Sequence, residues 1–318
     1  MTGPKYRRDL PQLGETRLLT DGGIETTLIF LEGLDLPYFA AFTLLATDNG
    51  RTALRRYYER YIKVAHQQNS GLILDSATWR ASRDWGHLLG YNDQALAAAN
   101  AQAIALLHDL RSTHERSHPF VISGNIGPRG DGYSVNNLLT RKEAAAYHDA
   151  QIAVFVRSGA DMVSAITMTH SGEAAGIALA CAKHDMPLAL AFTVETDGRL
   201  PSGQSLPDAI AEVDGSGATP PSYYMVNCAH PDHFRDALDP GSHWASRIRG
   251  LRANASRQSH EELDNAEVLD SGDPFELASD YAALQRLLPN LRVFGGCCGT
   301  DHRHIEAIGQ RCLPAPTG

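Results

Sequence analysis

Short apolar runs alternate with longer helical patterns along the whole chain of 318 residues. Each run has the length of a buried strand, and the segment after it repeats its apolar residues at helical spacing. Such alternation is typical of a parallel sheet covered by helices. Eight strand–helix units are present, which predicts a (β/α)8 TIM barrel forming a single domain over residues 1–318. The expected strands are 17–20, 72–74, 119–123, 161–166, 187–194, 223–227, 248–253 and 291–294.

Helices are expected between and after these strands. A capping box, with Thr140 as N-cap and Glu143 three residues later, marks the start of the helix at 140–158. No linker-like change in composition divides the chain, and the polar stretch 258–273 is expected to be a long loop. The other expected helices are 52–68, 93–115, 171–184, 206–213, 274–288 and 302–312.

The composition limits the function classes. Hydrophobic residues make up 43% of the chain and charged residues 20%, so a large core is expected and global disorder is not. A net charge of −9 without a basic stretch argues against nucleic-acid binding. The charged N-terminus and the lack of a long apolar run predict no secretory signal and no membrane span. We therefore expect a cytoplasmic protein, and composition leaves homo-oligomer formation open.

Adjacent cysteines stand in a glycine-rich run, Gly295–Gly299, directly after the last expected strand. Five cysteines form no disulfide-like framework, and neighbouring thiols are better placed to share a metal than to bridge each other. We interpret Cys297 and Cys298 as two ligands of one zinc ion. Cys228 follows the sixth expected strand. Because chemistry in such a barrel gathers where the strands end, Cys228 is predicted to be the third ligand.

Three thiolates indicate a particular chemistry. They leave the fourth tetrahedral position of zinc for water or substrate, whereas a structural site is closed by four protein ligands. They also make zinc a weak Lewis acid, better suited to binding a thiol as thiolate than to acidifying water. The predicted nucleophile is a zinc-bound substrate thiolate rather than a protein side chain. Lowering the pKa of a thiol increases its reaction rate only a few-fold. We therefore expect most of the rate enhancement to come from holding the thiol and the methyl donor in line in a buried pocket.

Three motifs together resemble the homocysteine S-methyltransferase family: Leu19-Thr20-Asp21-Gly22-Gly23, Val226-Asn227-Cys228 and Gly295-Gly296-Cys297-Cys298-Gly299-Thr300. The resemblance covers nearly the whole chain. It implies a (β/α)8 barrel with Zn²⁺ on the three cysteines, and methyl transfer to the thiol of homocysteine, giving methionine. The implied donor is a free small molecule of the S-methylmethionine, S-adenosylmethionine or betaine type, because no segment resembles a folate or cobalamin domain. Asp21 is implied to help hold the amino acid substrate.

One position departs from the family pattern. The family commonly has Phe-Glu-Thr after the fourth strand, and its Glu binds the substrate's amino group; here the run is Ala165-Ile166-Thr167. Losing such a charge-assisted hydrogen bond costs about 1.5–3 kcal/mol, or about 10- to 150-fold in affinity. We therefore expect homocysteine or a related thiol as acceptor, with Glu173 or Glu195 as the compensating acid.

Other residues that follow the strands are candidates with structural alternatives. The expected substrate-binding residues are Asp21, Gly22, Trp79, Thr167 and Asn227. Asp21 also fits an Asx turn, Trp79 a core position and Asn227 a partner for backbone groups. Four histidines near the cysteines are better explained by loop solvation or helix packing than as ligands or proton carriers: His230, His233, His302 and His304.

Two other function classes stay open. A zinc-dependent hydrolase on the same barrel needs a general base near the metal, and Glu195 and Asp21 are the candidates. Cysteine-rich ligation weighs against this class. A non-catalytic relative that binds a thiol or zinc is the second alternative, and Ile166 in place of Glu makes it less remote.

Overall fold

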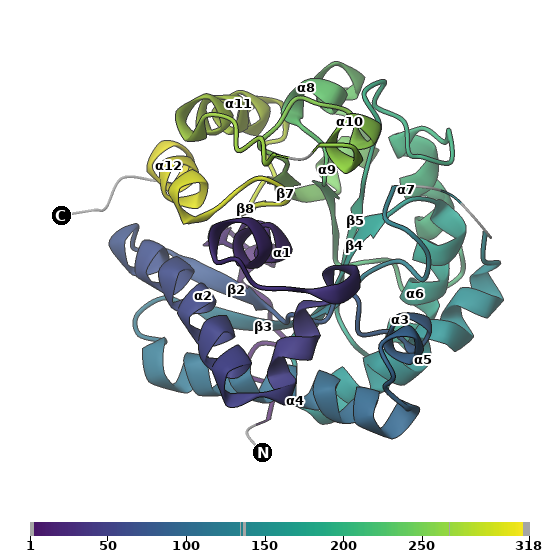
Figure 1. The fold of residues 1–318 in the computed structure, drawn as a ribbon. Helices are drawn as coiled ribbons and strands as arrows, with labels where there is room; N and C mark the ends of the chain where they lie inside the picture. Colours follow the sequence, from purple (N-terminus) through teal and green to yellow (C-terminus); the bar gives the residue numbers. More distant parts are fainter. Residues whose placement is uncertain (1–2, 134, 136–137, 267, 314–318) are drawn as a thin grey trace.

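The computed structural model describes residues 3–133, 135, 138–266 and 268–313. Within this part of the chain, parallel strands pair in sequence order, and the last pairs with the first to close a barrel. The predicted (β/α)8 barrel is therefore confirmed, and Figure 1 looks along it with the helices outside the strands. The strands are β1 (Leu18–Leu19), β2 (Gly71–Asp75), β3 (Phe120–Ile126), β4 (Met162–Met168), β5 (Leu188–Phe192), β6 (Tyr223–Asn227), β7 (Ile248–Ala253) and β8 (Val293–Gly296).

The main helices lie close to their predicted places. The capping box of Thr140 and Glu143 is formed at the start of α5. None of the helices in the described residues combines the length and apolarity that crossing a membrane requires. These main helices are α2 (Asp48–Gln67), α4 (Asp93–His114), α5 (Arg141–Arg157), α6 (Ser171–Lys183), α7 (Leu206–Asp214), α11 (Pro274–Leu287) and α12 (His302–Cys312).

Several short helices were not predicted, because one or two turns are too short to show an apolar period. The expected loop 258–273 contains α10 (His260–Asp264), which starts with a capping box between Ser259 and Glu262. After β1, α1 (Ile24–Thr26) continues into a π-helical turn (Thr27–Leu31) that lies in front of the barrel in Figure 1. The remaining short α-helices of the described residues are α3 (Arg83–Leu88), α8 (Pro231–Phe234) and α9 (His243–Ser246), and 3-10 turns occupy Pro11–Leu13, Pro37–Phe39, Ala41–Ala46 and Arg235–Ala237.

The barrel interior is filled below the strand ends. Apolar side chains from alternate strand positions pack inside it, among them Ile73, Val121, Met162 and Val293. Near them Gln12, from the N-terminal segment, is buried and donates from Nε2 to the Tyr223 hydroxyl at 3.3 Å. A second, larger cluster packs the outer strand faces against the helices. Space for a ligand is therefore left at the carboxyl ends of the strands.

Candidate active site

Three cysteine sulfurs meet at the carboxyl ends of β6 and β8. Cys228 directly follows β6, and Cys297 and Cys298 directly follow β8. The three Sγ atoms lie within 4.8 Å of one another. Tetrahedral zinc with Zn–S bonds of about 2.3 Å holds its sulfurs about 3.8 Å apart, so these three cysteines need only small shifts of their sulfurs to hold the ion. The convergence predicted from the sequence is thus present, although β7 separates the two strands.

Two of these cysteines are joined in the structure. Cys228 and Cys297 form a disulfide, with Cα atoms 5.4 Å apart, whereas the sequence predicted reduced thiols. Sulfurs that converge on one ion are also close enough to bond to each other. The same placement therefore serves a disulfide or a pair of metal-binding thiolates, and only the reduced pair can bind metal.

Asn227 and Thr167 connect two of the sulfurs. The Asn227 side chain accepts from the Thr167 backbone N–H at 2.8 Å and donates to Thr167 Oγ1 at 2.9 Å. The same Asn227 amide lies 3.8 Å from Cys297 Sγ, and Thr167 Oγ1 lies 3.8 Å from Cys228 Sγ. Thr167 and Cys228 both have positive φ, at 63° and 52°, a strained region for residues with a side chain. The strain sits where both side chains are aimed at the sulfur site.

The third sulfur has its own neighbour. The hydroxyl of Tyr133 lies 3.3 Å from Cys298 Sγ, and its ring stacks on His260 with centroids 4.2 Å apart. His260 in turn contacts the Cys228 carbonyl oxygen through Nε2 at 2.6 Å and Glu195 through Nδ1 at 3.1 Å. Each of the three sulfurs therefore has a hydrogen-bonding side chain beside it.

A cavity of about 330 Å³ opens over the sulfurs. This volume is in the range of small-molecule sites. Of the predicted substrate-binding residues, Asp21, Gly22, Trp79 and Thr167 line it. Asn227 does not line it and is fully buried, so its place is behind the sulfurs and not against a ligand.

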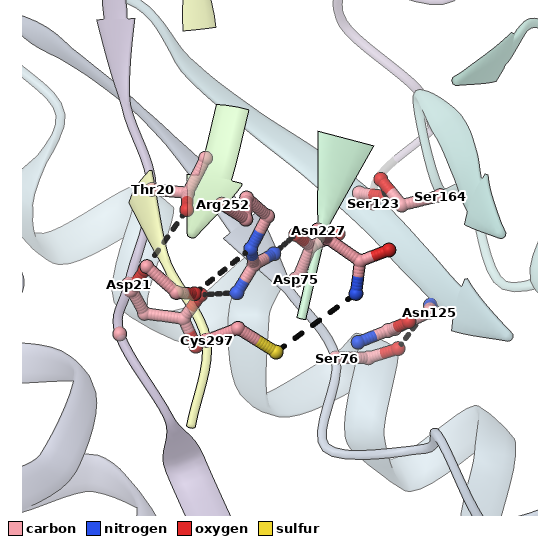
Figure 2. Close-up of polar contacts among 12 residues, drawn as sticks. Thr20, Asp21, Asp75, Ser76, Ser123, Asn125, Ser164, Asn227, Arg252 and Cys297 are labelled. Carbon is pink, nitrogen blue, oxygen red and sulfur yellow. Dashed lines mark hydrogen bonds and ion pairs between the residues drawn. The ribbon is translucent and has the colours of Figure 1, made fainter. Parts of the chain in front are cut away.

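A buried ion cluster lies at the cavity wall. Arg252, on β7, donates to Asp21 Oδ1 at 2.5 Å and pairs with Asp75 at the end of β2 (Figure 2). Tyr57 donates to the other oxygen of Asp21 at 3.0 Å. Burial raises the pKa of Asp21 to about 6, and the second carboxylate, Asp75, adds to this against the opposing effect of Arg252. Both oxygens of Asp21 thus have partners inside the protein, so its predicted role in holding substrate stays a prediction.

A sequence profile described as homocysteine S-methyltransferase matches residues 18–312. The chain belongs to the homocysteine S-methyltransferase family. Membership of this family supports a methyltransferase that acts on a thiol. The resemblance inferred from the three motifs is therefore confirmed.

Solved structures of one family member share the fold. The homocysteine methyltransferase MmuM from Escherichia coli in its oxidized form has a TM-score of 0.75 at 18% identity, covering 96% of this chain and 99% of that chain. Its metallated form gives a TM-score of 0.72 at the same identity, covering 96% and 100%. No curated protein matches the sequence. At this identity the similarity establishes the barrel fold.

The two proposed compensating acids lie outside the cavity wall. Glu173, at the start of α6, is buried and contacts His148 at 2.8 Å and His170 at 3.6 Å. Glu195 contacts His260, as described above. Ile166, which the sequence analysis expects in place of the family's Glu, lines the cavity and packs with the barrel interior. Acids that do line the cavity are Asp21, Glu25, Asp75, Asp131 and Asp270.

The four candidate histidines lie away from the cavity, and several residues that do line it were not predicted from the sequence. His230, His233, His302 and His304 do not line the cavity. His304 contacts the Ser271 carbonyl at 2.8 Å, and His230 caps α8. The sequence analysis did not find the cavity residues Glu25, Asp75, Arg80, Tyr133 and Arg252. Arg252 left a usable signal, because it is a charged residue near the carboxyl end of a barrel strand, where functional residues are expected.

Proposed function

We propose that the protein is a zinc-dependent S-methyltransferase. It passes a methyl group from a small-molecule donor of the S-methylmethionine, S-adenosylmethionine or betaine type to the thiol of homocysteine or a related thiol, giving methionine or its analogue. The observation that carries this is the convergence of three cysteine sulfurs within 4.8 Å at the floor of a cavity in a member of this family. A cytoplasmic location is part of the proposal, since metal binding needs reduced thiols.

Cys228, Cys297 and Cys298 would hold the zinc, which when bound favours the acceptor's sulfur as thiolate. The chain's own residues support these ligands. Asn227, Thr167 and Tyr133 each place a hydrogen-bonding group beside one sulfur, which fixes ligand direction and moderates thiolate charge.

The reaction exchanges one bond for another. The acceptor sulfur forms a bond to the methyl carbon while the bond from that carbon to the donor's sulfur or nitrogen breaks, and the thiol proton goes to solvent. A thiolate and a cationic donor give two neutral products, so a largely apolar cavity favours the transfer. Trp79, Phe30 and Ile166 contribute such surface.

The hydrolase alternative receives less support from the side-chain contacts. Its candidate bases were Asp21 and Glu195. Asp21 is held by Arg252 and Tyr57, and Glu195 contacts His260 outside the cavity wall. Neither is placed to activate a water beside the sulfurs.

The test combines metal content with turnover. The purified, reduced protein is loaded with zinc and incubated with homocysteine and S-methylmethionine, then with other donors and thiols, and methylated product is measured. We expect one zinc per chain and formation of methionine or another methylated thiol. Cys228→Ser, Cys297→Ser and Cys298→Ser should each lose bound zinc and activity, whereas Cys181→Ala, within α6, should keep both.

The outcomes separate the function classes. Product with another thiol but not with homocysteine would keep the chemistry and change the acceptor. Bound zinc without product from any thiol and donor would favour the non-catalytic relative. Full zinc content in the three serine variants would contradict the proposed site.

A further inference from the structure

Arg80 is a buried cation at the wall of the cavity. It lies next to Trp79 in the segment after β2, and only 6% of its surface is exposed. Its guanidinium carbon lies 4.0 Å from the ring centroid of Trp79 and 3.9 Å from that of Trp85. Contacts with two indole rings hold the guanidinium in one orientation and stabilise its charge. The group is therefore fixed in place before any ligand arrives.

The hydrogen-bond capacity of Arg80 is largely unused. Nη1 donates to the Gly130 carbonyl at 2.9 Å, but the buried Nε has no hydrogen-bond partner. Among the described residues, no carboxylate lies within ion-pair distance of Arg80. This differs from the other two buried arginines: Arg111 pairs with Asp161, and Arg252 pairs with Asp21 and Asp75.

A buried guanidinium without an ion-pair partner is unfavourable, because it has lost water and the more distant carboxylates of Asp131 and Glu25 compensate its charge only in part. Burial lowers the pKa of Arg80 to about 10, so the group is still charged at neutral pH. The planar fork of donors matches the two oxygens of a carboxylate. A ligand in this cavity that carries a carboxylate would supply the missing partner.

We propose that Arg80 binds the carboxylate of a substrate in this cavity and so selects carboxylate-bearing molecules. This inference rests on the proposed function and names its substrate class. The carboxylate can belong to the thiol acceptor or to the methyl donor, and the recognition chemistry is the same for both. The apolar Ile166 at the family's amino-binding position makes Arg80 the stronger anchor for an amino acid ligand.

The experiment compares substrates with and without the carboxylate. For the acceptor, kcat/KM is measured for homocysteine and for its decarboxylated analogue, an aminopropanethiol. For the donor, S-methylmethionine is compared with its methyl ester. We expect the wild-type protein to prefer the carboxylate form of one of the two by about 10- to 100-fold. In Arg80→Gln the ratio of the two kcat/KM values should fall towards one. Arg80→Lys should keep part of the wild-type preference.

A matched control and a second readout keep the test decisive. Arg83→Gln changes an arginine that starts α3 and does not line the cavity, so the wild-type preference should remain. Trp79 and Trp85 flank Arg80, so ligand binding can also be followed by tryptophan fluorescence without turnover. Thermal unfolding of each variant reports whether it is folded.

The results distinguish this inference from the proposed function. Absence of methylated product with every donor and thiol contradicts the methyl transfer, while tighter binding of homocysteine than of its decarboxylated analogue, lost in Arg80→Gln, still supports Arg80. An equal preference in wild type and Arg80→Gln would overturn the inference even if methyl transfer is efficient. So would a wild-type protein with no preference for either carboxylate form.

Discussion

Arg252 and Asp21 form a buried ion pair, with Nη2 and Oδ1 2.5 Å apart, and the same guanidinium also pairs with Asp75. These residues come from β7, from the segment after β1 and from the end of β2. Side-chain exposure is 7% or less for all three. One cation thus joins three segments that are far apart in the sequence, and two carboxylates depend on it.

Removing Arg252 should be strongly destabilising. In Arg252→Met two buried carboxylates lose their cation, and breaking a buried pair in this way costs about 3–5 kcal/mol. The free energy of unfolding is measured by urea titration. Arg55→Met, which breaks the exposed pair with Asp109 at 2.7 Å, is the control and should cost about 1 kcal/mol or less. Similar losses in the two variants would contradict a structural role for Arg252.

Arg252 shows where sequence reasoning stops. The boundaries of β7 were predicted as observed, and strand alternation places Arg252 on the face opposite Leu251 and Ala253. The partners of Arg252 were not predictable, because they depend on the register between strands far apart in the sequence.

The cysteines could be brought together from the sequence alone, since all parallel strands of a barrel end at one face. Tyr133 lies in a long segment between β3 and α5 without apolar periodicity, so no pattern pointed to it.

Asn227 should control both stability and metal affinity. Replacing it by Ala removes the acceptor of the Thr167 backbone N–H and the donor beside Cys297 Sγ. Leaving a buried donor unpaired costs about 1–3 kcal/mol. Loss of a group that orients a ligand typically weakens metal binding by about 10- to 100-fold. Unfolding experiments and competition with a chelator measure the two effects. Asn290→Ala, which removes only a hydrogen bond to the Ser246 carbonyl, is the control and should leave metal affinity unchanged and cost less stability.

Gly299 is required next to the cysteine pair. Its φ is 79°, and a Cβ there would lie 2.7 Å from the Asp270 carbonyl oxygen and 3.0 Å from the Ala255 Cβ. Gly217 has a similar φ of 82° with nothing within 4 Å, so Gly217→Ala measures the backbone strain alone, about 1–2 kcal/mol. Gly299→Ala adds overpacking of about 1–3 kcal/mol and should displace Cys298, lowering zinc content. Equal stability and zinc content in the two variants would show that the close contacts are relieved without moving the site.

Glu173 should make stability depend on pH in the acid range. Burial raises its pKa, but hydrogen bonds from His148 and His170 outweigh this and lower the pKa to about 2 from an ordinary value of 4.5. Between these values the unfolded chain binds the proton and the folded chain does not, so stability falls as the pH is lowered from 4.5 to 2. The full effect is about 3 kcal/mol. In Glu173→Gln this contribution is absent, so its free energy of unfolding should change less steeply across that window than that of the wild type. Glu59→Gln, at an exposed position, serves as the control, and a wild-type slope in Glu173→Gln would contradict the assignment.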